Sequence, residues 1–92
     1  MTLSDAVSHL ASFDDQDTIY AAEPWSAASA VAVATEPAEG GLPVEAQRLG
    51  LTYFLEVFVA REFLEDWTLN LDAEPPLQDK VRRLIQYAVK DA

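Results

Sequence analysis

The chain has 92 residues, with 16 Asp and Glu against 6 Lys and Arg, a formal net charge of −10 and no cysteine. This length corresponds to one domain near the lower size limit for folding without metals or disulfides. The lack of cysteine excludes disulfides, thiol catalysis and cysteine-based zinc sites. Half of the residues are hydrophobic, which is enough for a modest core, so we expect residues 1–92 to form a single folded domain.

The charge is unevenly distributed. Residues 1–79 hold fifteen acids and two bases, a net −13, whereas residues 80–92 hold four bases and one acid, a net +3. An acidic body repels the phosphates of nucleic acids and anionic lipids, so we expect neither nucleic acid nor membrane as a partner. It favours a basic protein partner, or it simply keeps the chain in solution.

The hydropathy pattern gives no sign of a membrane-spanning helix or of a signal peptide. No apolar run approaches the ~18 residues of a membrane-spanning helix. The first ten residues, MTLSDAVSHL, lack the basic start and long apolar core of a signal peptide. Together with the absence of cysteine, this predicts a cytoplasmic location.

Three elements are predicted in the first third of the chain. Apolar residues recur at helical spacing over residues 3–13, and the acidic cluster DDQD at 14–17 ends that helix because carboxylates at a helix C-terminus oppose its dipole. The sequences TIYAA at 18–22 and AVAVAT at 30–35 are typical of short strands. A turn containing Pro24 separates the two strands.

The middle and end of the chain carry clear helix signals. After a Pro- and Gly-rich loop at 36–43, a short helix is predicted over 43–49, with Gly50 suited to the left-handed position that follows a helix. The segment 76–90 has an apolar stripe at helical period and predicts an amphipathic helix.

The dense stretch YFLEVFVAREFLEDW at 53–67 predicts a strand that runs directly into a helix. As one helix it would be apolar on every face, which a small domain cannot bury. As a strand it places Leu51, Tyr53, Leu55 and Val57 on one face, with Thr52, Phe54 and Glu56 on the other. From about Phe58 the spacing becomes helical, and we expect the core to contain its apolar face, formed by Val59, Ala60, Phe63, Leu64 and Trp67. The order α-β-β-(short α)-β-α-α predicts an α+β fold, a small three-stranded, mainly antiparallel sheet with helices packed on one face.

The residues offer little material for catalysis. His9 is the only histidine, and no serine lies in a nucleophile-elbow sequence, so we expect no catalytic residue. The carboxylates of Asp14, Asp15 and Asp17 lack the spacing, glycine and distal Glu of a calcium loop. We therefore expect no metal site and no cofactor, and we interpret these acids as a solvated turn or, alternatively, as a site for a basic partner.

Two other residues are binding candidates. Glu56 lies among large apolar residues in FLEVF. A carboxylate there either faces solvent, needs a partner, or serves a ligand. The candidate partners are Arg61, Arg82 and Arg83. Trp25 follows Pro24 in a predicted turn. It either folds over the core or stands exposed as a binding anchor.

The last helix has a second stripe, formed by Lys80, Arg83, Tyr87 and Lys90. A basic face with an aromatic residue is able to bind phosphates. On a chain of this net charge we favour a solvated face, or a face that neutralises acids on its own body or on a second copy.

The segments DTIYAAEPW, SAVAVATEP and YFLEVFVAREFLEDW, within residues 17–67, resemble a family of small acidic bacterial domains of uncharacterised function. In size and charge the chain is also similar to immunity proteins that neutralise toxins. We expect a non-enzymatic acidic protein-interaction module, immunity-type or regulatory, that binds a basic protein partner. The alternatives are a homo-oligomeric (homodimer) structural domain, or a small enzyme or ligand-binding domain that uses Glu56.

Overall fold

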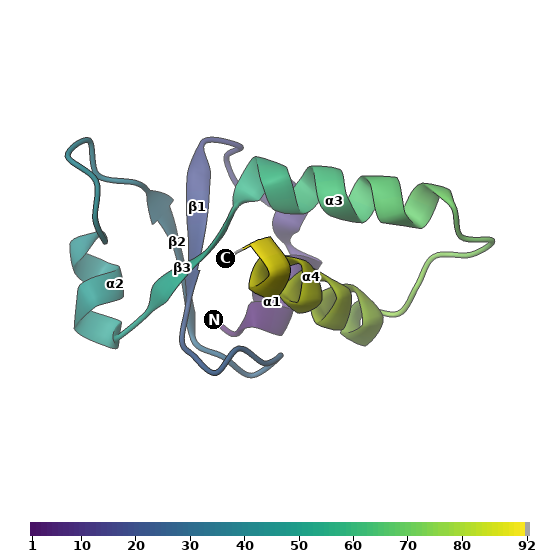
Figure 1. Cartoon of the computed structure of the whole chain (residues 1–92), viewed down its shortest axis with the longest axis horizontal. Coiled ribbons are helices and arrows are strands. Elements are labelled where there is room, and N and C mark those ends of the chain that lie inside the picture. The colour runs from purple at the N-terminus through teal and green to yellow at the C-terminus, as the bar shows by residue number, and fades with distance from the viewer. Residues whose placement is uncertain (92) are drawn as a thin grey trace.

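The computed structural model describes residues 1–91 (Figure 1). The elements follow in the order α1 (Leu3–Ser8), η1, a 3-10 turn (Leu10–Ser12), β1 (Asp17–Ala21), β2 (Val31–Thr35), α2 (Val44–Leu49), β3 (Thr52–Glu56), α3 (Val57–Leu69) and α4 (Leu77–Asp91). The predicted elements are therefore present, with most bounds shifted by one or two residues.

The sheet confirms the predicted α+β class. Its three strands lie in the order β2-β1-β3, and both pairings are antiparallel. In the β1–β2 hairpin Ile19 pairs with Val33 and Tyr20 with Ala32. Because paired residues point to the same face, Ile19 and Val33 share one face and Tyr20 and Ala32 share the other.

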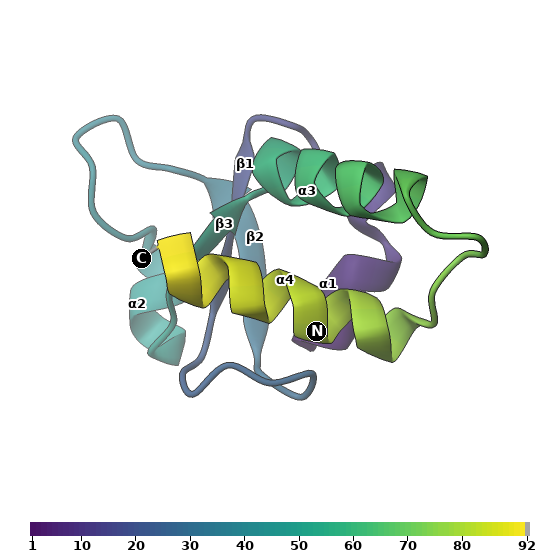
Figure 2. The same ribbon diagram turned by 45° about the vertical axis from the view of Figure 1, so that its right-hand side comes forward.

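Three helices cover one face of the sheet. Figures 1 and 2 show α1, α3 and α4 on the same side of the strands, with α3 and α4 running side by side in opposite directions. The main core lies between these helices and the sheet. Its buried residues include Leu3, Val7, Ile19, Val31, Phe54, Leu55, Val57, Leu64, Val81 and Leu84.

The short helix α2 lies on the opposite face, which the sequence did not indicate. There Tyr20, Ala46 and Leu51 form a small second cluster, joined by the partly buried Leu42 and Ala32. Gly50 closes α2 in the left-handed conformation, φ 70°, as predicted. This conformation favours glycine because it has no Cβ.

The predicted faces of the third strand are wrong from residue 55 onward. Tyr53 pairs with Tyr20, but Leu55 pairs with Ile19, so Phe54 is an extra residue in a β-bulge. A bulge places consecutive residues on the same side and shifts all later ones to the other face. Phe54 and Leu55 are therefore both buried in the main core, and Glu56, opposite Thr18, moves to the face of Tyr20.

The first helix is shorter than predicted. A capping box starts it, in which the Thr2 hydroxyl accepts from the Asp5 amide at 3.1 Å and the Asp5 carboxylate accepts from the Thr2 amide at 3.0 Å. The hydroxyls of Ser8 and Ser12 then donate to the carbonyls of Asp5 and His9. Such bonds compete with the helical ladder, and the chain continues as the 3-10 turn η1.

Candidate functional site

The three carboxylates of the acidic turn each have a partner within the chain. Asp14 accepts from the Gln16 amide at 2.8 Å, Asp15 forms an ion pair with Arg61, and Asp17 accepts from the Thr35 hydroxyl at 2.9 Å. These contacts tie the turn to α3 and to the end of β2. Across residues 1–91, no group of three or more His, Asp or Glu is placed to hold a metal ion.

Arg61 is the main polar connection between α3 and the N-terminal segment. Its Nε and one terminal nitrogen donate to the Leu10 carbonyl at 3.0 and 2.9 Å, and the same terminal nitrogen donates to the Phe13 carbonyl. Its other terminal nitrogen meets Asp15. Arg61 therefore serves the fold and is not the partner of Glu56.

Trp25 is anchored to the core and does not project from its turn. Its Nε1 donates to the Ala21 carbonyl at 3.3 Å, and its ring meets Phe54 edge-on with the ring centroids 4.9 Å apart. An indole that is half-buried with its N–H bonded covers the core edge. The binding role predicted for Trp25 receives no support from this geometry.

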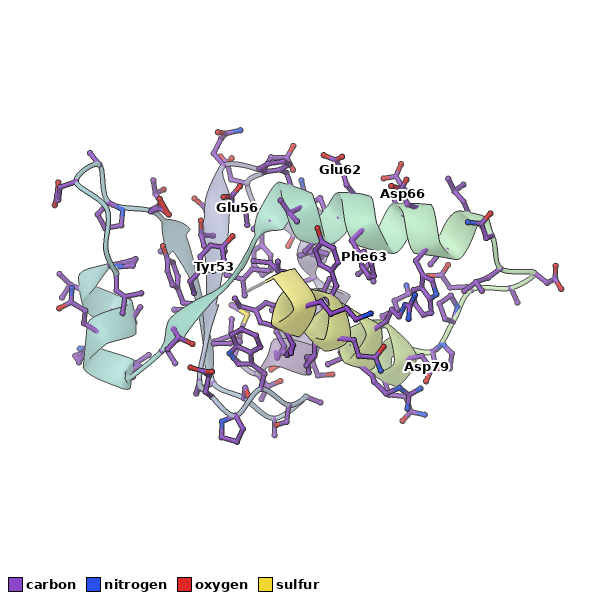
Figure 3. The ribbon with its side chains drawn as sticks, viewed as in Figure 1. Tyr53, Glu56, Glu62, Phe63, Asp66 and Asp79 are labelled. Carbon is purple, nitrogen blue, oxygen red and sulfur yellow. The ribbon has the colours of Figure 1, made fainter. Side chains whose placement is uncertain are left out.

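Glu56 is half-buried and immediately precedes α3 (Figure 3). Its side chain makes no capping bond to that helix. The arginines considered as its partners are engaged elsewhere, Arg82 with Asp79 and Arg83 with the ring of Trp67. None of the hollows described below includes Glu56.

Tyr20 is the most buried titratable side chain that the structure describes, with 1% of its surface exposed. Within residues 1–91 its hydroxyl has no hydrogen-bond partner. Burial raises the pKa of Tyr20 and the charge of Glu36 adds to the rise, while the Thr18 hydroxyl opposes it without forming a bond of ordinary geometry. Tyr20 belongs to the small cluster under α2 and lines none of the three hollows described below.

An open groove between α3 and α4 is the most distinctive surface feature. Phe63 of α3 stacks on Tyr87 of α4 with the centroids 4.4 Å apart, and Arg83 lies 5.9 Å from the centre of the Trp67 ring. Figure 3 shows Phe63 between the two helices. These contacts form the floor of the groove.

Three hollows lie along α3 and α4. Their volumes are about 570, 360 and 270 Å³. The first and second share Phe63 and Tyr87, and the first and third share Arg83 and Gln86. We call this continuous surface the α3–α4 groove. Its lining residues are Phe58, Val59, Glu62, Phe63, Asp66, Trp67, Asp79, Arg82, Arg83, Ile85, Gln86, Tyr87, Val89 and Lys90.

The groove has an acidic rim on α3 and a basic rim on α4. Glu62 and Asp66 lie on the first, and Figure 3 shows both on the outer side of α3. Arg83 and Lys90 lie on the second. Among the described side chains, no ion pair joins one rim to the other.

Apolar side chains are exposed along the same surface. Phe58 is 41% and Val89 60% exposed. An open aromatic surface of this kind, bordered by charges, is typical of a protein contact site.

No family model, curated protein or solved structure matches the chain. The resemblance to small acidic bacterial domains therefore stays a prediction, and the candidate site rests on its geometry. Within residues 1–91, no helix has the length and apolarity needed to cross a membrane.

The groove was not identified from the sequence, although its parts were visible there. The helical face with Val59, Phe63 and Trp67 was interpreted as core, and Tyr87 was placed in the basic stripe of the last helix. Only the antiparallel packing of α3 on α4 brings the two sets together. The signal in the sequence that points to the groove is the presence of large aromatic residues at the edge of the buried stripe on both helices.

Proposed function

We propose that this chain is a non-enzymatic protein-interaction domain and that the α3–α4 groove is its contact surface. The observation that carries the proposal is an open groove floored by the stacked Phe63 and Tyr87 and bordered by exposed apolar residues. Aromatic and arginine side chains dominate binding energy at protein interfaces. Here both types line one surface, and Arg83 is held over Trp67.

The chemistry of the groove suits a contact surface, because its floor is aromatic and its charged groups lie on exposed rims. His9 lies on the N-terminal segment, where its Nδ1 is within hydrogen-bond distance of the Asp5 carbonyl at 3.0 Å and of the Ser8 hydroxyl at 3.1 Å. A catalytic role for Glu56 would need a hollow around this carboxylate, and the three hollows lie elsewhere.

The partner we propose is a basic protein surface. The acidic rim of Glu62 and Asp66 would pair with its cations, which would steer association and set orientation, while the aromatic floor would supply most of the affinity. An immunity-type or regulatory role in the cytoplasm is the setting we propose for the domain. Its support is the size of the chain, its net charge and its lack of cysteine.

Photo-crosslinking in the cells that make the protein tests this function. Benzoylphenylalanine replaces Phe58 at the groove in one variant and Val44 on α2, 81% exposed, in a matched control. We expect discrete protein adducts from position 58 and few or none from position 44. Equal labelling at the two positions, or no adduct at position 58, would refute the groove as a contact surface.

A further inference from the structure

The charged residues on the two rims follow a fixed order along the antiparallel helices α3 and α4. The contacts Phe63–Tyr87 and Trp67–Arg83 show that four residues forward on α3 correspond to four residues backward on α4. Asp66 is therefore level with Arg83, and Glu62 lies within one turn of Lys90. At these two levels the groove has a carboxylate on the α3 side and a cation on the α4 side, whereas its third hollow holds the Asp79–Arg82 ion pair of α4.

A surface with this order is complementary to itself. Consider two copies that meet groove to groove. In the first arrangement, a two-fold axis parallel to the helices places α3 of one copy over α4 of the other at the same level. In the second arrangement, a two-fold axis across the helices places α3 over α3 and α4 over α4. The first arrangement brings Asp66 near Arg83 of the second copy. The second arrangement places like charges together, which is unfavourable.

We infer that the partner of the α3–α4 groove is a second copy of this chain, bound by the two-fold axis parallel to the helices. This inference rests on the proposed function and names its partner. The dimer would bury the aromatic floor inside a bundle of four antiparallel helices, two from each copy. The basic surface that the acidic rim requires would be α4, the only strongly basic segment of the chain.

The size of the groove sets the expected affinity. A helix of 13 residues, the length of α3, is roughly 20 Å long, and two adjacent helices are roughly 20 Å wide. The projected contact is roughly 400 Å² per copy, or about 800 Å² in total, which is below the size of stable interfaces and in the range of weak, transient ones. We therefore expect a dissociation constant in the micromolar range.

Exchange of charges between two variants tests the inference. Asp66→Arg carries a cation on both rims, and Arg83→Glu carries an acid on both rims. Each variant alone would form a dimer with two like-charge contacts in place of two ion pairs, so we expect its dissociation constant to rise roughly tenfold. In a one-to-one mixture every such contact pairs opposite charges again, and we expect an affinity close to that of the wild type.

Sedimentation equilibrium over the micromolar range measures these affinities, with a wild-type dimer at twice the 10.1 kDa of the chain. Glu39→Arg and Arg48→Glu, both exposed and outside the groove, change the net charge by the same amounts and should leave the dimer unchanged. Circular dichroism checks that each variant is folded.

Three results would overturn the inference. A wild-type monomer at hundreds of micromolar would exclude the second copy as partner, and the crosslinking at position 58 would then decide separately whether the groove binds another protein. A dimer unaffected by either variant would assign self-association to a different face. A mixture that stays as weak as the single variants would exclude the pairing of α3 with α4.

Discussion

Arg61 is predicted to be the polar side chain whose loss destabilises the fold most. Its guanidinium donates three hydrogen bonds to the carbonyls of Leu10 and Phe13 and pairs with Asp15. Replacement by alanine removes all of these contacts at the junction of η1 and α3. Alanine leaves both carbonyls without the charged donor that now satisfies them.

The magnitude follows from the contacts. A hydrogen bond to a charged group contributes about 1.5–3 kcal/mol. The Leu10 carbonyl keeps a bond from the Phe13 amide, at 3.4 Å, so the full cost falls chiefly on the Phe13 carbonyl. The Asp15 pair adds little because Asp15 is more than half exposed. We expect Arg61→Ala to lower the free energy of unfolding by about 2 kcal/mol, which corresponds to a Tm decrease of roughly 8–16 °C in a domain of this size.

Urea unfolding followed by tryptophan fluorescence measures this change. Arg48→Ala is the control, because Arg48 forms only an exposed pair with Glu45 at 3.4 Å and its loss should cost less than about 0.5 kcal/mol. Arg61→Lys should be intermediate, since it keeps the charge and loses the planar set of donors. If Arg61→Ala were no less stable than Arg48→Ala, the connecting role assigned to Arg61 would be wrong.

Two further predictions concern titratable groups. Tyr20→Phe should leave the free energy of unfolding unchanged or raise it by up to about 1 kcal/mol, because it removes a buried hydroxyl without a partner; a loss of stability in urea would show that the hydroxyl is bonded. The pKa of Tyr20 in the folded state is raised above the ordinary 10.0. The free energy of unfolding should therefore fall as pH rises from 10.0 through the raised pKa, and Tyr20→Phe should weaken this fall in an alkaline titration. The hydrogen bond from the Thr2 amide, and after it the Thr2 side chain, lower the pKa of Asp5 below 3.8. Its contribution is present above pH 3.8 and lost as pH falls through the lowered value, so Asp5→Asn should be less stable at neutral pH and show a weaker acid dependence of Tm; an identical acid profile would contradict the capping role.

The elements and fold class were predictable because local signals agree with the tertiary structure. The amphipathic stripe of α4, the strand patterns of β1 and β2, and Gly50 after α2 each depend on residues close in sequence. The junction of β3 and α3 was predictable for a different reason. No single helix could have buried all the apolar residues between 53 and 67.

The bulge and the groove were not predictable, because both depend on pairing between distant segments. Nothing in the sequence near Phe54 indicates that β1 skips this residue, and this skip decides the face on which Glu56 lies. The groove depends on how far α3 rotates against α4. The acids of the 14–17 turn were visible as a cluster, but their partners Arg61 and Thr35 come from other elements.

The small cluster under α2 makes the two sides of the sheet unequal in local stability. Among the described residues, only Tyr20, Ala46 and Leu51 are fully buried in it, and the main core shares none of them. Opening of α2 and its flanking loop would therefore expose little apolar surface and leave the strands held by α1, α3 and α4. Such segments open at a small fraction of the global unfolding free energy. The sheet with α1, α3 and α4 would then stay folded while α2 opens locally. The amide protons of α2 would exchange with solvent well before those of α3 and α4.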